Sequence, residues 1–219
     1  MARQKRVFIE ALILAIVVFG LGVTLGFFVE SWRADKITSM YTQAEIGLLD
    51  IKIITQIYDT VDINCEEAVR QNLEFADRIY QEAVILERYE GAQRLGEELI
   101  TQHKKYDLLR TSLWLNSQKT KNNCKDDSYD TIVYLYQYNE PDIEKKALQA
   151  VYSRALGELK EEFGSEMMLL PMAGDLDIKS IDILKEHYGV TELPAIIINE
   201  KKVFTGTITK EEILSILNK

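Results

Sequence analysis

The hydrophobic pattern of the chain changes twice along its length. Residues 11–29 form an apolar run without a single charged side chain. Residues 33–117 then contain no proline and place apolar residues three and four positions apart, the spacing of one face of a helix. From residue 130 onward, short apolar runs alternate with amphipathic segments. The pattern predicts an α+β protein with an apolar N-terminal helix, a helical region and a C-terminal α/β domain.

The first apolar run has the length of a helix that crosses a bilayer, about 20 residues. Three basic residues precede it: Arg3, Lys5 and Arg6. Positive charge marks the cytoplasmic end of a membrane helix. The sequence therefore predicts a cytoplasmic stub at 1–6, a transmembrane anchor in the lipid bilayer at 7–29, and a single-pass protein whose remaining domains lie outside the cytoplasm.

A cleaved signal peptide is the alternative interpretation of this run. Signal peptides usually have a shorter apolar region that ends in small residues at a cleavage site. Here the run ends on Phe27 and Phe28, followed by Trp32. Aromatic residues in this place are typical of a membrane interface, so we expect an uncleaved anchor.

Two glycines inside the anchor have the spacing that lets membrane helices approach closely. Gly22 and Gly26 are four residues apart, as in the small-xxx-small pattern. This pattern is compatible with a homodimer formed through Gly22 and Gly26. Glycine is also common in membrane helices that do not dimerise, so the pattern alone does not decide between the two.

The region at 31–117 is predicted to be a bundle or stalk of three helices, at 31–58, 65–89 and 92–117. Connections this short make neighbouring helices antiparallel, as in a coiled-coil-like up-down-up bundle. The first helix has one predicted apolar face, which comprises Ile37, Tyr41, Ala44, Leu48, Ile51, Ile54 and Tyr58.

The two cysteines are predicted to meet at one end of this bundle. Cys65 begins the second helix, and Cys124 lies just beyond the third. In an up-down-up arrangement both positions fall at the end far from the membrane. Disulfides persist outside the cytoplasm, so we predict a Cys65–Cys124 disulfide. Two unrelated thiols are the alternative.

The remaining chemistry-bearing side chains indicate no metal or cofactor site. Two cysteines and two histidines give no cluster with the spacing of metal ligands. We expect His103, beside Lys104, and His187, beside Glu186, to lie on solvated helix faces. The net charge of −9 also argues against nucleic-acid binding, for which a basic surface is expected.

The last segment, 130–219, follows a polar stretch at 118–129 that we predict to be a linker. Its predicted elements are a strand at 131–138, a helix at 142–163, an apolar run at 167–172, a helix at 178–188, strands at 195–198 and 203–205, and a helix at 209–217. Thr209 and Glu212 have the spacing of a capping box at the start of the last helix.

Part of this segment resembles the thioredoxin superfamily. The stretch Tyr188-Gly-Val-Thr-Glu-Leu-Pro194-Ala-Ile-Ile-Ile-Asn199 is similar to the family's segment before and through its third strand. The stretch Lys202-Val-Phe-Thr-Gly206 is similar to the strand that follows. Together with the element order, the resemblance covers about residues 130–219. It implies a thioredoxin-like domain in which Pro194 is a cis-proline facing the active-site helix.

The family's active-site motif, Trp-Cys-Gly-Pro-Cys, is degenerate here. Its counterpart is Tyr138, Asn139, Glu140, Pro141 and Asp142. Aligning the prolines places Asn139 and Asp142 at the two cysteine positions. Disulfide exchange requires a thiolate, so we predict a redox-inactive site without catalytic residues. Asn139 is instead expected to cap the following helix, with Asp142 as its capping-box partner.

The resemblance also implies a place where a polypeptide binds. In the family, the backbone before the cis-proline pairs with an extended peptide by strand addition. The corresponding candidate groove here comprises Leu193, Pro194, Tyr138 and Asn139. We therefore expect a membrane-anchored, extracytoplasmic binding or scaffold protein whose partner is a protein or peptide, and we find no CxxC motif, metal cluster or nucleophile that would indicate an enzyme.

Two other interpretations remain open at this point. The chain could be a thiol-disulfide oxidoreductase, or the membrane partner of one, that uses Cys65 and Cys124. Alternatively, the helical stalk could be the functional part and assemble with another membrane complex.

Overall fold

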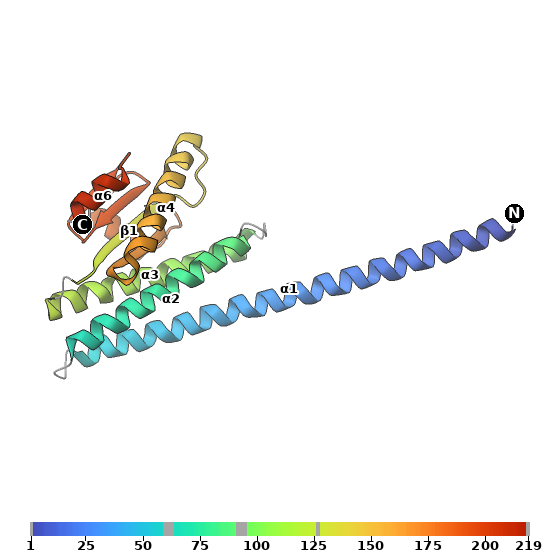
Figure 1. Cartoon of the computed structure of the whole chain (residues 1–219), viewed down its shortest axis with the longest axis horizontal. Coiled ribbons are helices and arrows are strands. Elements are labelled where there is room, and N and C mark those ends of the chain that lie inside the picture. The colour runs from blue at the N-terminus through green and yellow to red at the C-terminus, as the bar shows by residue number, and fades with distance from the viewer. Residues whose placement is uncertain (1, 59–63, 91–95, 126–127, 218–219) are drawn as a thin grey trace. The chain divides into compact units, whose positions relative to one another are not determined.

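The computed structural model describes residues 2–58, 64–90, 96–125 and 128–217. These residues belong to two compact units, Met1–Gln43 and Ala44–Lys219. The structure does not describe the side chains of the predicted apolar face of the first helix, which runs from Ile37 to Tyr58. The architecture is mixed α+β with one four-stranded sheet (Figure 1).

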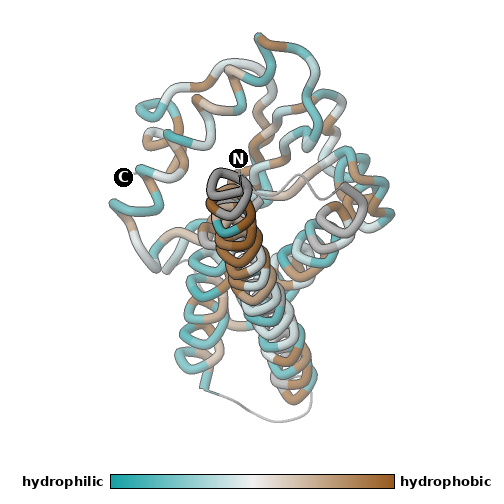
Figure 2. Tube along the Cα trace, turned by 90° about the vertical axis from the view of Figure 1, so that its right-hand side faces the viewer, coloured by the Kyte–Doolittle hydropathy of each residue, from teal (hydrophilic) through white to brown (hydrophobic). Residues whose placement is uncertain are grey.

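The first unit is formed by the N-terminal part of α1 (Ala2–Tyr58). Its segment Val7–Trp32 is helical, long and apolar enough to cross a membrane, and its side chains are exposed. Figure 2 shows this apolar segment in brown near the N-terminus. The helix predicted at 31–58 continues directly from this apolar segment, because α1 runs from Ala2 to Tyr58 without a break.

The second unit contains two long antiparallel helices, α2 (Cys65–Glu90) and α3 (Gly96–Cys124). Asn72 Nδ2 near the start of α2 donates to Thr120 Oγ1 near the end of α3, over 2.9 Å. Further along, the Tyr106 hydroxyl donates to the Ile79 carbonyl over 2.7 Å. The antiparallel pairing predicted for these helices is therefore confirmed. Helix α3, however, extends to Cys124, so the predicted linker at 118–129 begins inside it.

The two cysteines meet where α2 begins and α3 ends. Cys65 and Cys124 lie at disulfide-bonding distance, with their Sγ atoms 2.17 Å and their Cα atoms 5.5 Å apart. The predicted pairing is confirmed. It joins residues that are 59 positions apart in the sequence and holds one end of the α2–α3 pair together.

The sheet has the strand order β2-β1-β3-β4. Strand β1 is parallel to β2 and antiparallel to β3, and β3 is antiparallel to β4. The strands are β1 (Asp130–Tyr136), β2 (Met167–Ala173), β3 (Ala195–Ile198) and β4 (Lys202–Thr205). The helices around them are α4 (Ile143–Phe163), α5 (Lys179–His187) and α6 (Lys210–Leu217), with the short helix η1 (Gly164–Glu166) after α4. The predicted order of strands and helices is confirmed.

One side of the sheet packs against α4 and α6. The buried side chains there include Ile132 and Ile196 from the sheet, Leu156 from α4 and Ile213 from α6. Helix α6 begins as predicted, because Thr209 N–H donates to Glu212 Oε2 over 2.8 Å and Glu212 N–H donates to Thr209 Oγ1 over 3.2 Å.

Helix α3 packs against β2 and also reaches the β3–β4 turn. Its Thr111 hydroxyl contacts Met172 Sδ at 3.3 Å, and Trp114 Nε1 donates to Glu200 Oε1 over 2.8 Å. The Trp114 ring stacks on Tyr188, with the ring centres 5.3 Å apart. The α2–α3 pair therefore shares its core with the sheet, and residues 44–219 form one compact unit.

Candidate functional site

Three loops converge at one end of the sheet, where β1 and β2 end and β3 begins. Leu135 pairs with Ala195, so Pro194 and Leu193 lie just beyond the last paired position of β1. Gly174 N–H donates to the Tyr136 carbonyl over 2.7 Å and ties the β2 loop to β1. A Cβ on Gly174 would lie 2.9 Å from Leu193 Cδ1, so this loop also packs against the segment before β3.

The four predicted groove residues belong to these converging loops. Pro194 is buried, Leu193 and Tyr138 are partly buried, and Asn139 is exposed. The peptide bond between Leu193 and Pro194 is cis, as the resemblance implies. Within the part of the chain that the structure describes, no hydrogen bond involves the backbone of Glu192 or Leu193.

The junction between β1 and α4 is built around a helix cap. Asp142 is the N-cap residue, and its Oδ1 accepts from Glu144 N–H over 2.8 Å and from Lys145 N–H over 3.3 Å. Glu140 Oε1 in turn accepts from Asp142 N–H over 2.8 Å. The expectation that Asn139 caps this helix is wrong. Helix α4 begins only at Ile143, so Asp142, the residue immediately before it, is the N-cap.

This junction is far from the cysteine pair. His103 of α3 lies beside the junction, and the centre of its ring is 4.6 Å from the centre of the Tyr138 ring. Cys124 follows 21 residues later on the same helix, which corresponds to roughly 30 Å at 1.5 Å per residue. Cys65 is bonded to Cys124 and is equally remote. This distance does not favour a role for these cysteines at the end of the sheet.

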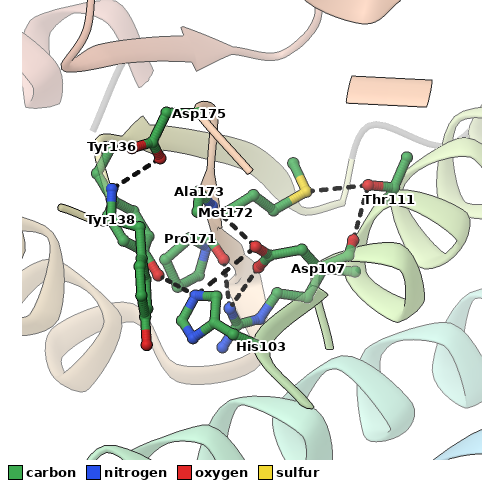
Figure 3. Close-up of polar contacts among 10 residues, drawn as sticks. His103, Asp107, Thr111, Tyr136, Tyr138, Pro171, Met172, Ala173 and Asp175 are labelled. Atoms are coloured by element: carbon green, nitrogen blue, oxygen red, sulfur yellow. Dashed lines mark hydrogen bonds and ion pairs between the residues drawn. The ribbon is translucent and has the colours of Figure 1, made fainter. Parts of the chain in front are cut away.

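A buried polar network, which the sequence reasoning missed, lies beside the junction. The Asp107 side chain is fully buried, and its Oδ2 accepts from Ala173 N–H over 3.1 Å. Arg110 Nη1 donates to the Pro171 carbonyl over 2.6 Å and to Asp107 Oδ1 over 3.3 Å. Figure 3 shows Asp107 and Thr111 of α3 against residues 171–173 of β2.

The network occupies part of one edge of the sheet. Strand β2 is an edge strand, and unpaired backbone groups on such a strand invite pairing with another chain. Asp107 and Arg110 occupy the Ala173 N–H and the Pro171 carbonyl. At the other end of β2, Lys160 Nζ donates to the Met167 carbonyl over 2.6 Å. An incoming peptide therefore finds these three backbone groups already occupied.

His103 joins the network to the end of β1. Its Nε2 is 2.6 Å from the Tyr136 hydroxyl and 3.6 Å from Asp107 Oδ2. The side chain is only 12% exposed, so the prediction of a solvated face is wrong for His103. The prediction is confirmed for His187, which is exposed. Helix α3 thus positions the aromatic residues of the β1–α4 junction through His103 (Figure 3).

The comparisons with known proteins assign neither a family nor an activity. No protein-family model matches this chain, and no curated protein was found to be similar to it. Among the residues that the structure describes, no group of His, Cys, Asp or Glu side chains could hold a metal ion. The function has to be inferred from the geometry of the site.

Burial raises the pKa of the Asp107 carboxyl above its ordinary value of 3.8, against the opposing effects of Arg110, His103 and the Ala173 N–H. The folded protein therefore keeps this proton to a higher pH than the unfolded chain does. Stability that comes from the protonated form is present below pH 3.8 and is lost as pH rises through the raised pKa.

We therefore expect wild-type protein to lose stability relative to an Asp107→Asn variant as pH rises above the ordinary aspartate range. Urea unfolding midpoints measured across the acid range, in detergent, give this difference directly. The exposed Asp177→Asn variant is the control and should follow the wild-type curve. Parallel curves for wild type and Asp107→Asn would contradict the assignment.

Proposed function

We propose that the protein is a membrane-anchored, extracytoplasmic binding or scaffold protein. Its thioredoxin-like domain lacks redox activity and binds an extended polypeptide at the end of the sheet. The apolar segment Val7–Trp32 serves as the anchor, with the N-terminus in the cytoplasm. The pairing of Cys65 with Cys124 supports a location outside the cytoplasm, where disulfides persist.

The thioredoxin-like assignment is supported by three features of the α/β part. Its elements follow the order that the resemblance implies, from β1 through α6. The Leu193–Pro194 bond is cis. The degenerate motif at 138–142 lies at the junction of the first strand and the first helix of this part, where the family carries its active site.

The lack of redox activity follows from the chemistry of the junction. Asn139 and Asp142 stand where the family has cysteines, and neither side chain can form the thiolate that disulfide exchange requires. The Asp142 carboxylate already accepts hydrogen bonds from the first N–H groups of α4. The positive end of the helix therefore stabilises a structural cap in this protein.

The observation that carries the binding proposal is the unpaired backbone before β3. Glu192 and Leu193 lie at the end of the sheet next to the β1–α4 junction, and no described residue is hydrogen-bonded to their backbone. An extended peptide can satisfy these groups by strand addition. The β2 edge is less available for such pairing, because Asp107 and Arg110 already occupy the Ala173 N–H and the Pro171 carbonyl.

Blocking the end of the sheet tests this proposal. We expect an Asn139→Trp variant to lose binding to extended peptides by about tenfold, or about 1.4 kcal/mol, because the resemblance places position 139 opposite the backbone before Pro194, where a bulky ring would block the peptide. Full-length protein in lipid nanodiscs is screened against immobilised random peptides, and the peptides that wild type retains are titrated with the variant. Glu161→Trp, at an exposed position on α4, is the matched control.

Two results would contradict the proposal. In the first, wild type retains no peptide above the level of empty nanodiscs. In the second, the Asn139→Trp and Glu161→Trp variants bind the selected peptides equally well.

A further inference from the structure

The three loops that converge at the end of the sheet carry acidic side chains and no basic ones. They comprise residues 137–142, 174–178 and 188–194, and none of these residues is a lysine, an arginine or a histidine. Their acidic residues are Glu140, Asp142, Asp175, Asp177 and Glu192. The unpaired backbone before β3, which carries the binding proposal, therefore lies in acidic surroundings.

Two of these carboxylates, Asp177 and Glu192, have no partner within the described part of the chain. Both side chains are exposed, and neither forms a hydrogen bond or an ion pair there. Asp142 and Asp175 differ, because Asp142 caps α4 and Asp175 Oδ1 accepts from Tyr138 N–H over 2.8 Å (Figure 3). Asp177 and Glu192 are therefore available to pair with charges on a bound peptide.

The basic side chains next to these loops do not balance their charge. Lys185 on α5 lies 3.0 Å from Asp182 and donates to the Gly174 carbonyl over 2.5 Å, so it is already paired. Exposed lysines in the first turns of α4 and α5 are Lys145, Lys146 and Lys179. Glu144 and Asp182 lie in the same turns, so acidic residues still outnumber basic ones at this end of the sheet.

We propose that this site selects segments of a partner protein that are extended and rich in lysine and arginine. The inference rests on the proposed function, because strand addition beside Leu193 supplies the binding and the loop charges decide which sequences bind. Alternate side chains of a strand point to the same face. A peptide with a basic residue at every second position can therefore direct all of them toward the acidic loops.

The charges are the feature of the site that can discriminate between peptides. Main-chain hydrogen bonds are the same for every sequence, so strand addition alone selects extended segments of any composition. Complementary charge favours basic segments, and like charge disfavours acidic ones. An exposed ion pair changes an affinity by about twofold to fivefold, and salt screens this effect.

Two peptides that differ only in charge test the selectivity. Full-length protein in nanodiscs of zwitterionic lipid is titrated with a short peptide of alternating lysine and threonine, and with its counterpart in which glutamate replaces lysine. Empty nanodiscs give the background. We expect the lysine peptide to bind about tenfold more tightly, with an affinity that falls as salt is added. Equal binding of the two peptides, or tighter binding of the glutamate peptide, would overturn the proposal.

A charge-neutralising variant assigns the selectivity to these loops. An Asp177→Asn/Glu192→Gln protein should bind the lysine peptide about fivefold more weakly than wild type. Asparagine tolerates the left-handed backbone of position 177, where φ is 54°, so the fold should be kept. The matched control, Glu161→Gln/Glu211→Gln, removes the same charge from exposed positions on α4 and α6 and should bind like wild type. Equal weakening in both variants would overturn the role of the loops.

Two further results separate this inference from the proposed function. If the random-peptide screen retains peptides that are not enriched in lysine and arginine, the selectivity is overturned and the peptide site stands. If the screen retains none, both are overturned. A lysine peptide with a methylated backbone should lose binding, because it cannot pair with the backbone before β3. Unchanged binding of that peptide would show that charge alone attracts it and would overturn selection at this site.

Discussion

Replacing Asn139 and Asp142 together with cysteine is expected to give the protein a disulfide-reducing activity, whereas we expect none from the wild-type chain. The two positions flank Pro141 at the start of α4, so the new dithiol would sit at the positive end of a helix. That environment lowers a thiol pKa and supplies the thiolate for exchange. The dithiol would become a disulfide as a substrate disulfide becomes two thiols, and dithiothreitol would restore it.

Reduction of a disulfide-bonded substrate protein in the presence of dithiothreitol measures this gain. The Asn139→Cys single variant is the matched control, because one thiol cannot complete the exchange within the domain. Loss of the Asp142 cap costs about 1 kcal/mol of stability, so folding should be checked by circular dichroism. A folded double variant with no more activity than wild type would contradict the alignment of residues 138–142 with the thioredoxin motif.

Removing the disulfide is expected to cost about 4 kcal/mol of unfolding free energy. This figure follows from the chain-entropy model for a cross-link between residues 59 positions apart. The loss should appear in a Cys65→Ala/Cys124→Ala variant as a lower urea midpoint in detergent. Since Cys124 ends the helix that packs against β2, the loss should also loosen the packing of α3 on the sheet.

Chemical reduction supplies the control for this prediction. Wild type treated with dithiothreitol should unfold at the same urea concentration as the double variant, and the reductant should not change the variant itself. Equal stability of oxidised wild type and the variant would show that the pairing does not stabilise the fold. Alkylation of intact membranes should, in parallel, find both thiols unavailable.

Much of the fold was predictable because its signals are local. The apolar run at 11–29, the period of the helices and the Thr209–Glu212 capping box each depend on neighbouring residues. The pairing of Cys65 with Cys124 was predictable from topology, since antiparallel helices bring those two ends together. The helix boundary at 117 was wrong because polar residues such as Thr120 and Lys121 continue α3 to Cys124.

The polar network was not predicted, although its residues follow a helical spacing. His103, Asp107 and Arg110 are four and three residues apart, which places them on one face of α3. That pattern also describes an ordinary solvated face. The buried network differs from a solvated face because Asp107 and Arg110 bind backbone groups on the edge of β2. Such tertiary contacts join residues about 60 positions apart and leave no local signal.

The position of the helix cap was missed for a smaller reason. Both Asn139 and Asp142 are good capping residues, and the sequence alone gave the role to the first of them. The strand ends at Tyr136 and the helix begins at Ile143, which leaves Asp142 next to the first helical residue.

Photo-cross-linking in intact cells tests the central claim most directly, that the end of the sheet binds a polypeptide. A photoreactive amino acid replaces Asn139 in the full-length protein, and Glu161 in the control. We expect discrete protein adducts from position 139 that are absent at position 161. These adducts should disappear when an excess of wild-type protein, which carries no photoreactive group, competes for the partner. No adduct at 139, or the same adducts at both positions, would contradict binding at this site.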